Sequence, residues 1–202
     1  MELNEAIEVA KSLGLTIYDH NFGQGTYRNL EGVDPSLITV AELAIKLCRI
    51  DGTVIPGGGL RTEAQAQDNV SRGTGILNSL HRIQSSGFGH AIDLIPYFDG
   101  KPQWTLEECQ LMAKAVTQAA AILSVPHRKG CDFDQDRIWG EPKEWDWCHF
   151  EKPKPQHLAR AIEVMMLDRK DLGLDAEPAN DDATPANACA CPHCGNIVKL
   201  SA

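Results

Sequence analysis

Apolar residues recur every three to four positions in several stretches of the chain, which is the spacing of one face of a helix. The pattern is clearest over residues 3–13 and 155–170. Asp34-Pro35 favours a helix start, because aspartate caps a helix and proline suits its first turn. The stretch Thr105-Leu106-Glu107-Glu108 is a capping box. Helices are therefore predicted over residues 3–13, from 34 to about 51, for a short length from Thr62, from 105 to about 123, and over 155–170.

Short apolar runs between turn residues predict strands. The clearest is His90–Ile95, which Pro96 closes, whereas residues 14–33 and 73–89 have the composition of loops. Together the elements predict an α+β fold, in which helices surround a small, mostly antiparallel sheet. Further strand candidates are residues 53–55, 137–139 and 147–150, and the last helix is expected to turn Leu158, Ile162, Met165 and Met166 inward.

The composition is that of a globular protein: 43% of the 202 residues are hydrophobic and 23% are charged. The formal net charge of −9 disfavours binding to nucleic acid, because affinity for duplexes rests on basic side chains that neutralise phosphates. It also disfavours adhesion to anionic membranes. No apolar run approaches the roughly 20 residues that a membrane span needs. The N-terminus lacks the basic and apolar regions of a secretory signal, so we expect synthesis in a cytoplasm.

The composition divides the chain into three parts. Residues 1–174 form the expected compact domain, and residues 175–187, rich in Ala, Pro, Asn and Asp, predict a flexible linker. Residues 188–202 form a Cys-rich tail that resembles a zinc knuckle. Ligands so crowded rarely close a tetrahedron alone, so pairing across a dimer and loose metal affinity stay open as alternatives. The tail's candidate ligands for a second zinc are Cys189, Cys191, His193 and Cys194. The scattered cysteines Cys48, Cys109, Cys131 and Cys148 are expected to be buried as small apolar residues.

Three polar segments offer a catalytic metal site. A catalytic zinc needs three protein ligands and one open position, and His81, Asp93 and His149 supply two imidazoles and a carboxylate. Asp146 lies three residues before His149 and is the natural general base. Arg61 follows three glycines and can stabilise the oxyanion of a tetrahedral intermediate. Each residue alone has a plainer structural explanation, so the hypothesis depends on the three segments together.

Strand geometry bears on two of these assignments. His90 is a rival ligand, but it lies three residues from Asp93, and on a regular strand the two side chains point to opposite faces. His81, on the predicted loop, is therefore preferred. Asp146 and His149 are also three apart, so the chain must bend near Trp147 for both to reach one metal. The other histidines with no ligand at suitable spacing, His127 and His157, are interpreted as structural.

The ordered set of motifs resembles the VanY-type D-Ala-D-Ala carboxypeptidase superfamily of zinc peptidases, and within it the phage L-alanyl-D-glutamate endopeptidases that act as endolysins. The resemblance covers roughly residues 20–155, but residues 82–88 lengthen the gap that the family has after its first histidine. The matching segments are Gly59-Leu60-Arg61-Thr62, Ser79-Leu80-His81, Gly89-His90-Ala91-Ile92-Asp93-Leu94 and Asp146-Trp147-Cys148-His149-Phe150-Glu151.

The resemblance implies the fold of hedgehog and D-Ala-D-Ala peptidase domains over residues 1–174. It implies zinc on His81, Asp93 and His149, Asp146 as general base, Arg61 as the cation at the transition state, and Ser79 in support of the metal or substrate. The implied substrate is bacterial peptidoglycan. The implied protein is a monomer made in the host cytoplasm, which reaches the periplasmic cell wall after the membrane is permeabilised.

Two alternative functions remain at this stage. A D-Ala-D-Ala carboxypeptidase uses the same chemistry on another bond. A zinc-containing module that only binds the wall belongs to another class, but it needs neither Asp146 nor Arg61, and the chain carries both. An active peptidase is therefore favoured. The sequence leaves open whether the protein is a free endolysin, a virion-borne lysin or a bacterial enzyme.

Overall fold

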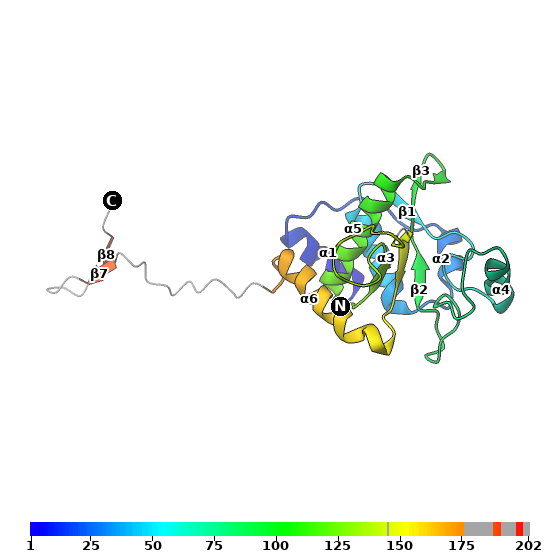
Figure 1. Ribbon diagram of the computed structural model, residues 1–202. Helices are drawn as coiled ribbons and strands as arrows, with labels where there is room; N and C mark the ends of the chain where they lie inside the picture. The colour runs from blue at the N-terminus through cyan, green and yellow to red at the C-terminus, as the bar shows by residue number, and fades with distance from the viewer. Residues whose placement is uncertain (145, 176–187, 191–196, 200–202) are drawn as a thin grey trace.

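The protein is described by a computed structural model over residues 1–144, 146–175, 188–190 and 197–199. Figure 1 shows helices α1, α3, α5 and α6 gathered on one side of the domain and α4 at its opposite edge, with β2 between them. Within the described residues, no helix combines the length and apolarity needed to cross a membrane. The helices are α1 (Leu3–Ser12), α2 (Gln24–Leu30), α3 (Pro35–Leu47), α4 (Glu63–Ser71), α5 (Leu106–Leu123) and α6 (Pro155–Asp171).

The strands are short, and every pair of named strands is antiparallel, so the α+β prediction is confirmed. One sheet has the order β1-β3-β4, and a second has the order β2-β6-β5. Near the C-terminus, β7 pairs with β8. The strands are β1 (Asp51–Thr53), β2 (Ala91–Asp93), β3 (Ile95–Phe98), β4 (Lys101–Pro102), β5 (Arg128–Gly130), β6 (Asp146–Glu151), β7 (Ala188–Ala190) and β8 (Ile197–Lys199).

One hydrophobic core joins the helices to the sheet that carries β2 and β6. Leu37 and Ile45 of α3 and Met112 of α5 are fully buried in it, together with Ile92 of β2 and Phe150 of β6. Buried apolar area of this kind is the main stabilising contribution to a domain. The two strands that carry polar site residues are therefore anchored on their apolar side.

The predicted helix starts are confirmed at their caps. The Asp34 side chain accepts a hydrogen bond from the Ser36 amide, and Pro35 occupies the first turn of α3. Thr105 accepts from the Glu108 amide at the start of α5. Thr62 and Gln65 form a reciprocal capping box at α4. Each cap satisfies an amide that the helix itself leaves without a partner.

Several predicted boundaries are wrong. The helix from Asp34 ends at Leu47, and the strand expected over residues 53–55 is instead β1, Asp51–Thr53. A Cβ on Gly52 would lie 2.7 Å from the Ile45 side chain, so close packing of β1 on α3 selects glycine there. The run His90–Ile95 is split, because β2 and β3 belong to different sheets. Pro96 does not end the run but pairs with Gly52 inside β3.

Other local predictions also need correction. Residues 137–139 form no strand; Arg137 has a φ of +74°, which a strand does not accept. The predicted loop over residues 14–33 contains the short helix α2. Of the four residues expected to face inward from α6, only Met165 is buried, and Leu158, Ile162 and Met166 are exposed. The buried face of α6 is instead Ala161, Val164, Met165 and Asp168, because small side chains allow close packing and Arg137 pairs with the Asp168 carboxylate.

Candidate metal centre and active site

His81, Asp93 and His149 come together from three separate segments. Each offers a ligand atom, and these atoms lie within 4.8 Å of one another. His81 Nε2 is 3.3 Å from Asp93 Oδ1 and 3.3 Å from His149 Nδ1. His149 Nδ1 is 2.9 Å from Asp93 Oδ1. Tetrahedral bonds of about 2.0–2.1 Å to zinc place neighbouring donor atoms about 3.3 Å apart, so this spacing suits such an ion.

Sheet register brings Asp93 and His149 together. The two residues are direct partners in the antiparallel pair of β2 and β6, so their side chains lie on the same face of the sheet. The interpretation that favoured His81 over His90 as the partner of Asp93 used the same alternation. His90 instead lies next to Ser86, whose Oγ is 2.7 Å from His90 Nε2, and it does not belong to the described group that could hold a metal ion.

His81 is held from the backbone on the loop before β2. The residue is 2% exposed, and its Nδ1 donates to the Gly59 carbonyl over 2.8 Å. In return the Arg61 amide donates to the His81 carbonyl over 2.8 Å. Ser79, which is also buried, accepts a hydrogen bond from the His81 amide through its Oγ at 3.3 Å. Ser79 therefore supports the loop that presents His81.

His149 is held from its other side by a carboxylate. Its Nε2 lies 3.2 Å from Glu151 Oε2, and Arg128 donates to the other oxygen of Glu151 over 2.7 Å. The Arg128 guanidinium lies over the ring of Phe133, 5.2 Å from its centre. A carboxylate acceptor fixes the ring hydrogen on Nε2 and turns Nδ1 toward Asp93. Glu151 and Arg128 were not predicted as site residues; the signal was Glu151 two positions after a ligand on a strand.

The chemistry of these donors fits a metal cation. Nδ1 of His81 and Nε2 of His149 both face other oxygen acceptors, so the two opposite nitrogens are turned toward Asp93 and can act as ligands once they carry no proton. Burial lowers the pKa of His149, but the hydrogen bonds to Asp93 and Glu151 outweigh this effect and raise it to about 10. Burial raises the pKa of Asp93, but the two histidines hold it well below its usual range. Without a metal ion, His149 therefore keeps a proton beside the Asp93 carboxylate, and a bound metal ion can take the place of that proton.

Asp146 reaches the centre through an irregularity in β6. Lys129 pairs with Phe150, but the next residue of β5, Gly130, pairs with Asp146. Residues 147–149 are therefore extra on β6, which is the bend that the sequence required near Trp147. Burial raises the pKa of the Asp146 carboxyl, and the charge of Asp93 raises it further. A carboxylate with a raised pKa beside a metal site is suited to accept a proton from water.

Arg61 lies on the other side of Asp93. Its Nη2 donates to Asp93 Oδ2 over 2.7 Å, and its Nε donates to the carbonyl of Gly57. A Cβ on Gly59 would collide with the carbonyl of Asn29, so the turn before Arg61 requires glycine at this position. The guanidinium is thus fixed beside a ligand carboxylate, with 16% of the side chain exposed.

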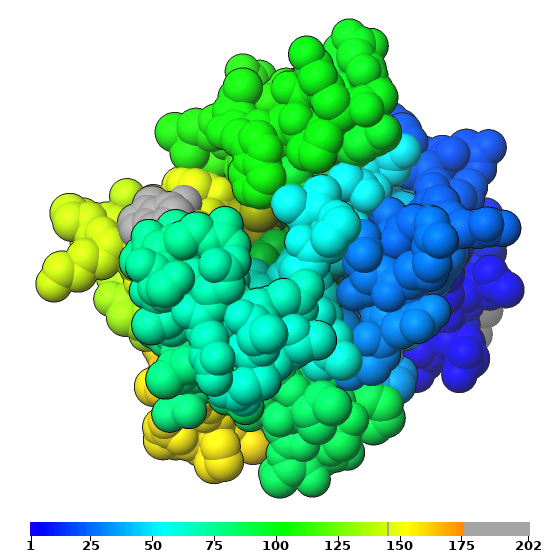
Figure 2. Space-filling model, turned by 90° about the vertical axis from the view of Figure 1, so that its right-hand side faces the viewer, coloured from blue at the N-terminus to red at the C-terminus, as the bar shows by residue number. Residues whose placement is uncertain are grey.

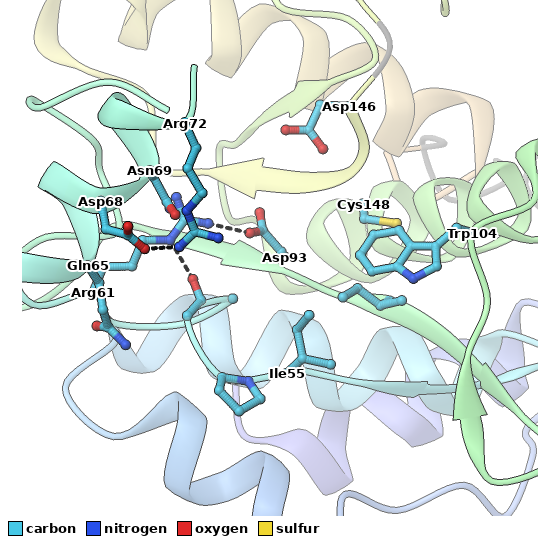
Figure 3. A pocket seen from close by; sticks show the side chains of 14 residues that line it. Ile55, Arg61, Gln65, Asp68, Asn69, Arg72, Asp93, Trp104, Asp146 and Cys148 are labelled. Atoms are coloured by element: carbon cyan, nitrogen blue, oxygen red, sulfur yellow. Dashed lines mark hydrogen bonds and ion pairs between the residues drawn. The ribbon is translucent and has the colours of Figure 1, made fainter. Parts of the chain in front are cut away.

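Two cavities, of about 280 and 310 Å³, meet at Arg61, Asp93 and Asp146. The first lies between α4 and Trp104, with Arg72 on one wall and Trp104 and Ile55 on the other (Figure 3). The second is lined by Ser79, His81, His149 and Lys154, among other residues. Figure 2 shows the hollow between α4, the segment before it and the green hairpin of β3 and β4. Both cavities therefore open onto the same candidate metal centre.

The cysteine predictions have different outcomes. Cys48, Cys109, Cys131 and Cys148 are all buried and free, as expected. The Sγ atoms of Cys109 and Cys148 lie 3.2 Å apart and join α5 to β6. In the tail, Cys191, His193 and Cys194 lie outside the described residues, as does most of the predicted linker 175–187. Cys189 belongs to β7, where its backbone pairs with Val198.

Three comparisons with known proteins identify the family of the chain. The family model of phage L-alanyl-D-glutamate peptidases matches residues 19–152, a range that contains Arg61, His81, Asp93, Asp146 and His149. The L-alanyl-D-glutamate peptidase of Escherichia phage T5 is 35% identical over 114 residues, which are 56% of this chain and 81% of that protein. The L-Ala D-Glu endopeptidase ChiX of Serratia marcescens has a similar crystal structure, with a TM-score of 0.52 and 27% identity, covering 65% of this chain and 89% of ChiX. The resemblance seen in the motifs is confirmed: the chain belongs to the phage L-alanyl-D-glutamate peptidase family.

Proposed function

We propose that this protein is a zinc peptidase that hydrolyses the L-Ala–D-Glu bond in the stem peptide of bacterial peptidoglycan. The observation that carries the proposal is the convergence of His81, Asp93 and His149, with Asp146 beside them in the same hollow. Family membership supports the bond that is cleaved. Zinc would be held by the two imidazoles and the Asp93 carboxylate, and it supplies Lewis-acid activation of the scissile carbonyl and of a water molecule.

The other residues have distinct roles in this proposal. Asp146 accepts a proton from the attacking water and delivers it to the departing amine of D-Glu, so the peptide bond breaks and a carboxylate and an amine are formed. Arg61 holds Asp93 in place and offers its cation to the charge that develops on the carbonyl oxygen. Ser79 keeps the His81 loop in position. The two cavities bind the peptide on either side of the scissile bond.

Product analysis on purified peptidoglycan tests this function. The zinc-loaded protein should create new D-Glu amino termini. Asp146→Asn should lower kcat by about 100-fold or more, because general-base catalysis contributes factors of that size, while zinc content stays unchanged. Asp99→Asn, at an exposed turn, is the matched control and should keep full activity. Release of free D-Ala instead would identify a carboxypeptidase, and a folded, zinc-loaded protein that cleaves nothing would favour a wall-binding module.

We further propose that the protein acts as a phage endolysin in host lysis. The phage family and the phage T5 relative support this role. The protein would be made in the host cytoplasm and reach the wall after the membrane is permeabilised. Expression in Gram-negative cells tests the role: turbidity should fall only when a membrane-permeabilising agent is added, and it should not fall with Asp146→Asn. Lysis without the agent would contradict the need for permeabilisation.

A further inference from the structure

Among the described residues, three arginine and lysine side chains line the two cavities that meet at the metal centre: Arg61, Arg72 and Lys154. Two of them are paired with carboxylates, Arg61 with Asp93 and Arg72 with Asp68. Lys154 lines the second cavity and, within the part of the chain that the structure describes, belongs to no ion pair. Its charge is therefore free to bind a ligand in that cavity.

The backbone holds Lys154 at a defined place beside the metal centre. Lys154 follows the last residue of β6 by three positions and is the N-cap residue of α6. Pro153 and Pro155 flank it, and a proline restricts both its own φ and the backbone of the residue before it. The Lys152 amide donates to the His90 carbonyl over 2.9 Å, which ties this connection to the segment that leads into β2.

The start of α6 does not itself favour a lysine. The first amides of a helix favour a side chain that accepts a hydrogen bond, and the helix dipole disfavours a cation there. Asp34, Thr62 and Thr105 cap their helices in this way, whereas no side-chain hydrogen bond caps α6 at Lys154. The cavity that Lys154 lines therefore explains this residue better than the stability of the helix does.

The nearby carboxylate of Glu151 has closer partners than Lys154. Arg128 donates to one of its oxygens over 2.7 Å, and His149 Nε2 lies 3.2 Å from the other. Burial raises the pKa of the Glu151 carboxyl, but His149, then Arg128 and last Lys154 bring it below its usual value. Glu151 therefore does not use up the charge of Lys154.

The substrate of the proposed reaction carries a carboxylate next to the bond that is cleaved. D-Glu has two carboxyl groups and the peptide continues through one of them, so the other is free on the residue that supplies the departing amine. A lysine ammonium group binds a carboxylate through charge-assisted hydrogen bonds. The first cavity instead has an apolar wall that includes Ile55 and Trp104 (Figure 3), which suits the methyl group of L-Ala. Charge and polarity together thus favour D-Glu in the cavity of Lys154.

We propose that Lys154 binds the free carboxylate of D-Glu, so that the protein selects peptides in which this group is not amidated. The inference rests on the proposed function, because it names the part of that substrate that Lys154 recognises. Lys154 is a specificity-determining residue in this proposal, and the proton transfers stay with Asp146. An amide keeps the shape of the carboxylate but not its charge, so the amidated peptide should bind about tenfold less tightly.

Two peptides that differ only in this group test the inference. Each is acetyl-L-Ala–D-Glu–L-Ala amide joined through the D-Glu side chain, and the remaining carboxyl is free in one peptide and amidated in the other. The zinc-loaded protein should have a KM about tenfold lower for the free peptide, whereas kcat should be the same for both. Binding energy that is equal in the ground state and the transition state changes KM and not kcat.

Substitutions of Lys154 should change the preference and little else. Lys154→Met keeps a long apolar side chain without the charge, so the KM values of the two peptides should become equal. Lys154→Arg keeps a cation and should retain the preference. Lys114→Met, at an exposed position of α5 outside both cavities, is the matched control and should keep the tenfold difference. A purely structural role for Lys154 would alter the KM of both peptides alike, and this result would contradict the inference.

Binding to an inactive variant separates this inference from the proposed function. With zinc-loaded Asp146→Asn, isothermal titration should give a Kd about tenfold lower for the free peptide, and equal values once Lys154→Met is added. The same binding by a protein that cleaves no peptidoglycan would sustain the role of Lys154 and overturn the hydrolysis. Equal Kd values with Lys154 present, no binding of either peptide up to millimolar concentration, or a preference that survives Lys154→Met would overturn the inference. Circular dichroism and zinc analysis establish that each variant is folded and loaded.

Discussion

At the scale of single residues, the orientation of two imidazoles decides what the metal centre can hold. His81 donates Nδ1 to the Gly59 backbone, whereas His149 presents Nε2 to a side chain, Glu151. A backbone carbonyl cannot be removed by mutation, but Glu151 can. The hydrogen bond between His149 and Glu151 can therefore be removed by a substitution, and its effect on metal binding can be measured.

Glu151→Ala should weaken zinc binding by about 10- to 100-fold, because outer carboxylates orient ligating histidines and raise their basicity. Glu151→Gln should lose less, since its amide oxygen can still accept from His149 Nε2. Competition with a chelating dye measures the affinity. The matched control is Glu163→Ala, which removes only an exposed pair with Arg160. An affinity for zinc within twofold of wild type in Glu151→Ala would refute this role.

The buried His127 should make the free energy of unfolding depend on pH. Burial, and then the charge of Lys129, lower its pKa to about 3, whereas an unfolded chain has a histidine pKa near 6.5. Between these values the unfolded state binds the proton and the folded state does not. The free energy of unfolding should therefore fall as pH decreases from 6.5 toward 3, by up to about 1.4 kcal/mol per pH unit from this residue.

The comparison of wild type with His127→Phe isolates this effect. Denaturant unfolding at pH 7, 6 and 5 should show a shallower loss of stability in the variant, which keeps a buried ring that cannot titrate. His157→Phe, at a half-buried position in the first turn of α6, is the control and should keep the wild-type slope. Equal slopes for wild type and His127→Phe would contradict the assignment.

At the scale of elements, the irregular pairing of β5 with β6 positions Asp146, the proposed general base. Ideal alternation sends Asp146 and His149 to opposite faces, and only the extra residues 147–149 bring them together. The sequence predicted that a bend is needed but not its source, because Gly130, its partner on β5, was not part of any predicted strand. Three-residue strands carry too little alternation to be recognised by pattern alone.

Gly130→Ala should disturb this arrangement selectively. A Cβ there would lie 2.7 Å from Asp146 Cβ and would also meet the Asp146 carbonyl, so β6 must shift at the base. We expect kcat to fall by about 10- to 100-fold, since misplacement by about 1 Å can cost that much. The affinity for zinc should stay unchanged, because His149 pairs with Asp93 of β2 on the other edge of β6. Gly25→Ala, which meets nothing within 4 Å, is the control. Equal kcat in both variants would contradict the expectation.

The wrong predictions for the buried face of α6 and for the strand end at Pro96 have one cause in common. Periodicity ranks side chains by hydrophobicity, but packing on α6 selected small residues and an aspartate paired with Arg137. Pro96 looked like a terminator, yet it lies opposite Gly52 in the middle strand of a sheet. These choices depend on contacts between distant segments. By contrast, caps act locally, and the helix starts at Asp34, Thr62 and Thr105 were predicted correctly.

At the scale of the whole molecule, the residues that follow α6 still contact the hydrophobic core. Leu172 and Leu174, which follow α6, pack against the core cluster. Arg169 pairs with Asp175 at 2.8 Å and donates to the Ala121 carbonyl of α5. Contacts with the helical core therefore reach Asp175, next to the predicted domain boundary at 174.

A chain that ends at Asp175 should keep the folded domain, its catalytic zinc and its hydrolysis of peptidoglycan. A chain that ends at Asp171 also loses Leu172 and Leu174, and its free energy of unfolding should fall by about 2–3 kcal/mol, the contribution of two partly buried leucines. Metal analysis of the full chain against the Asp175 form tests the proposed second zinc on Cys189, Cys191, His193 and Cys194. One extra zinc per full-length chain would support it, whereas equal zinc content would exclude it. A loss of activity in the Asp175 form beyond tenfold would show instead that the tail takes part in catalysis or in binding the wall.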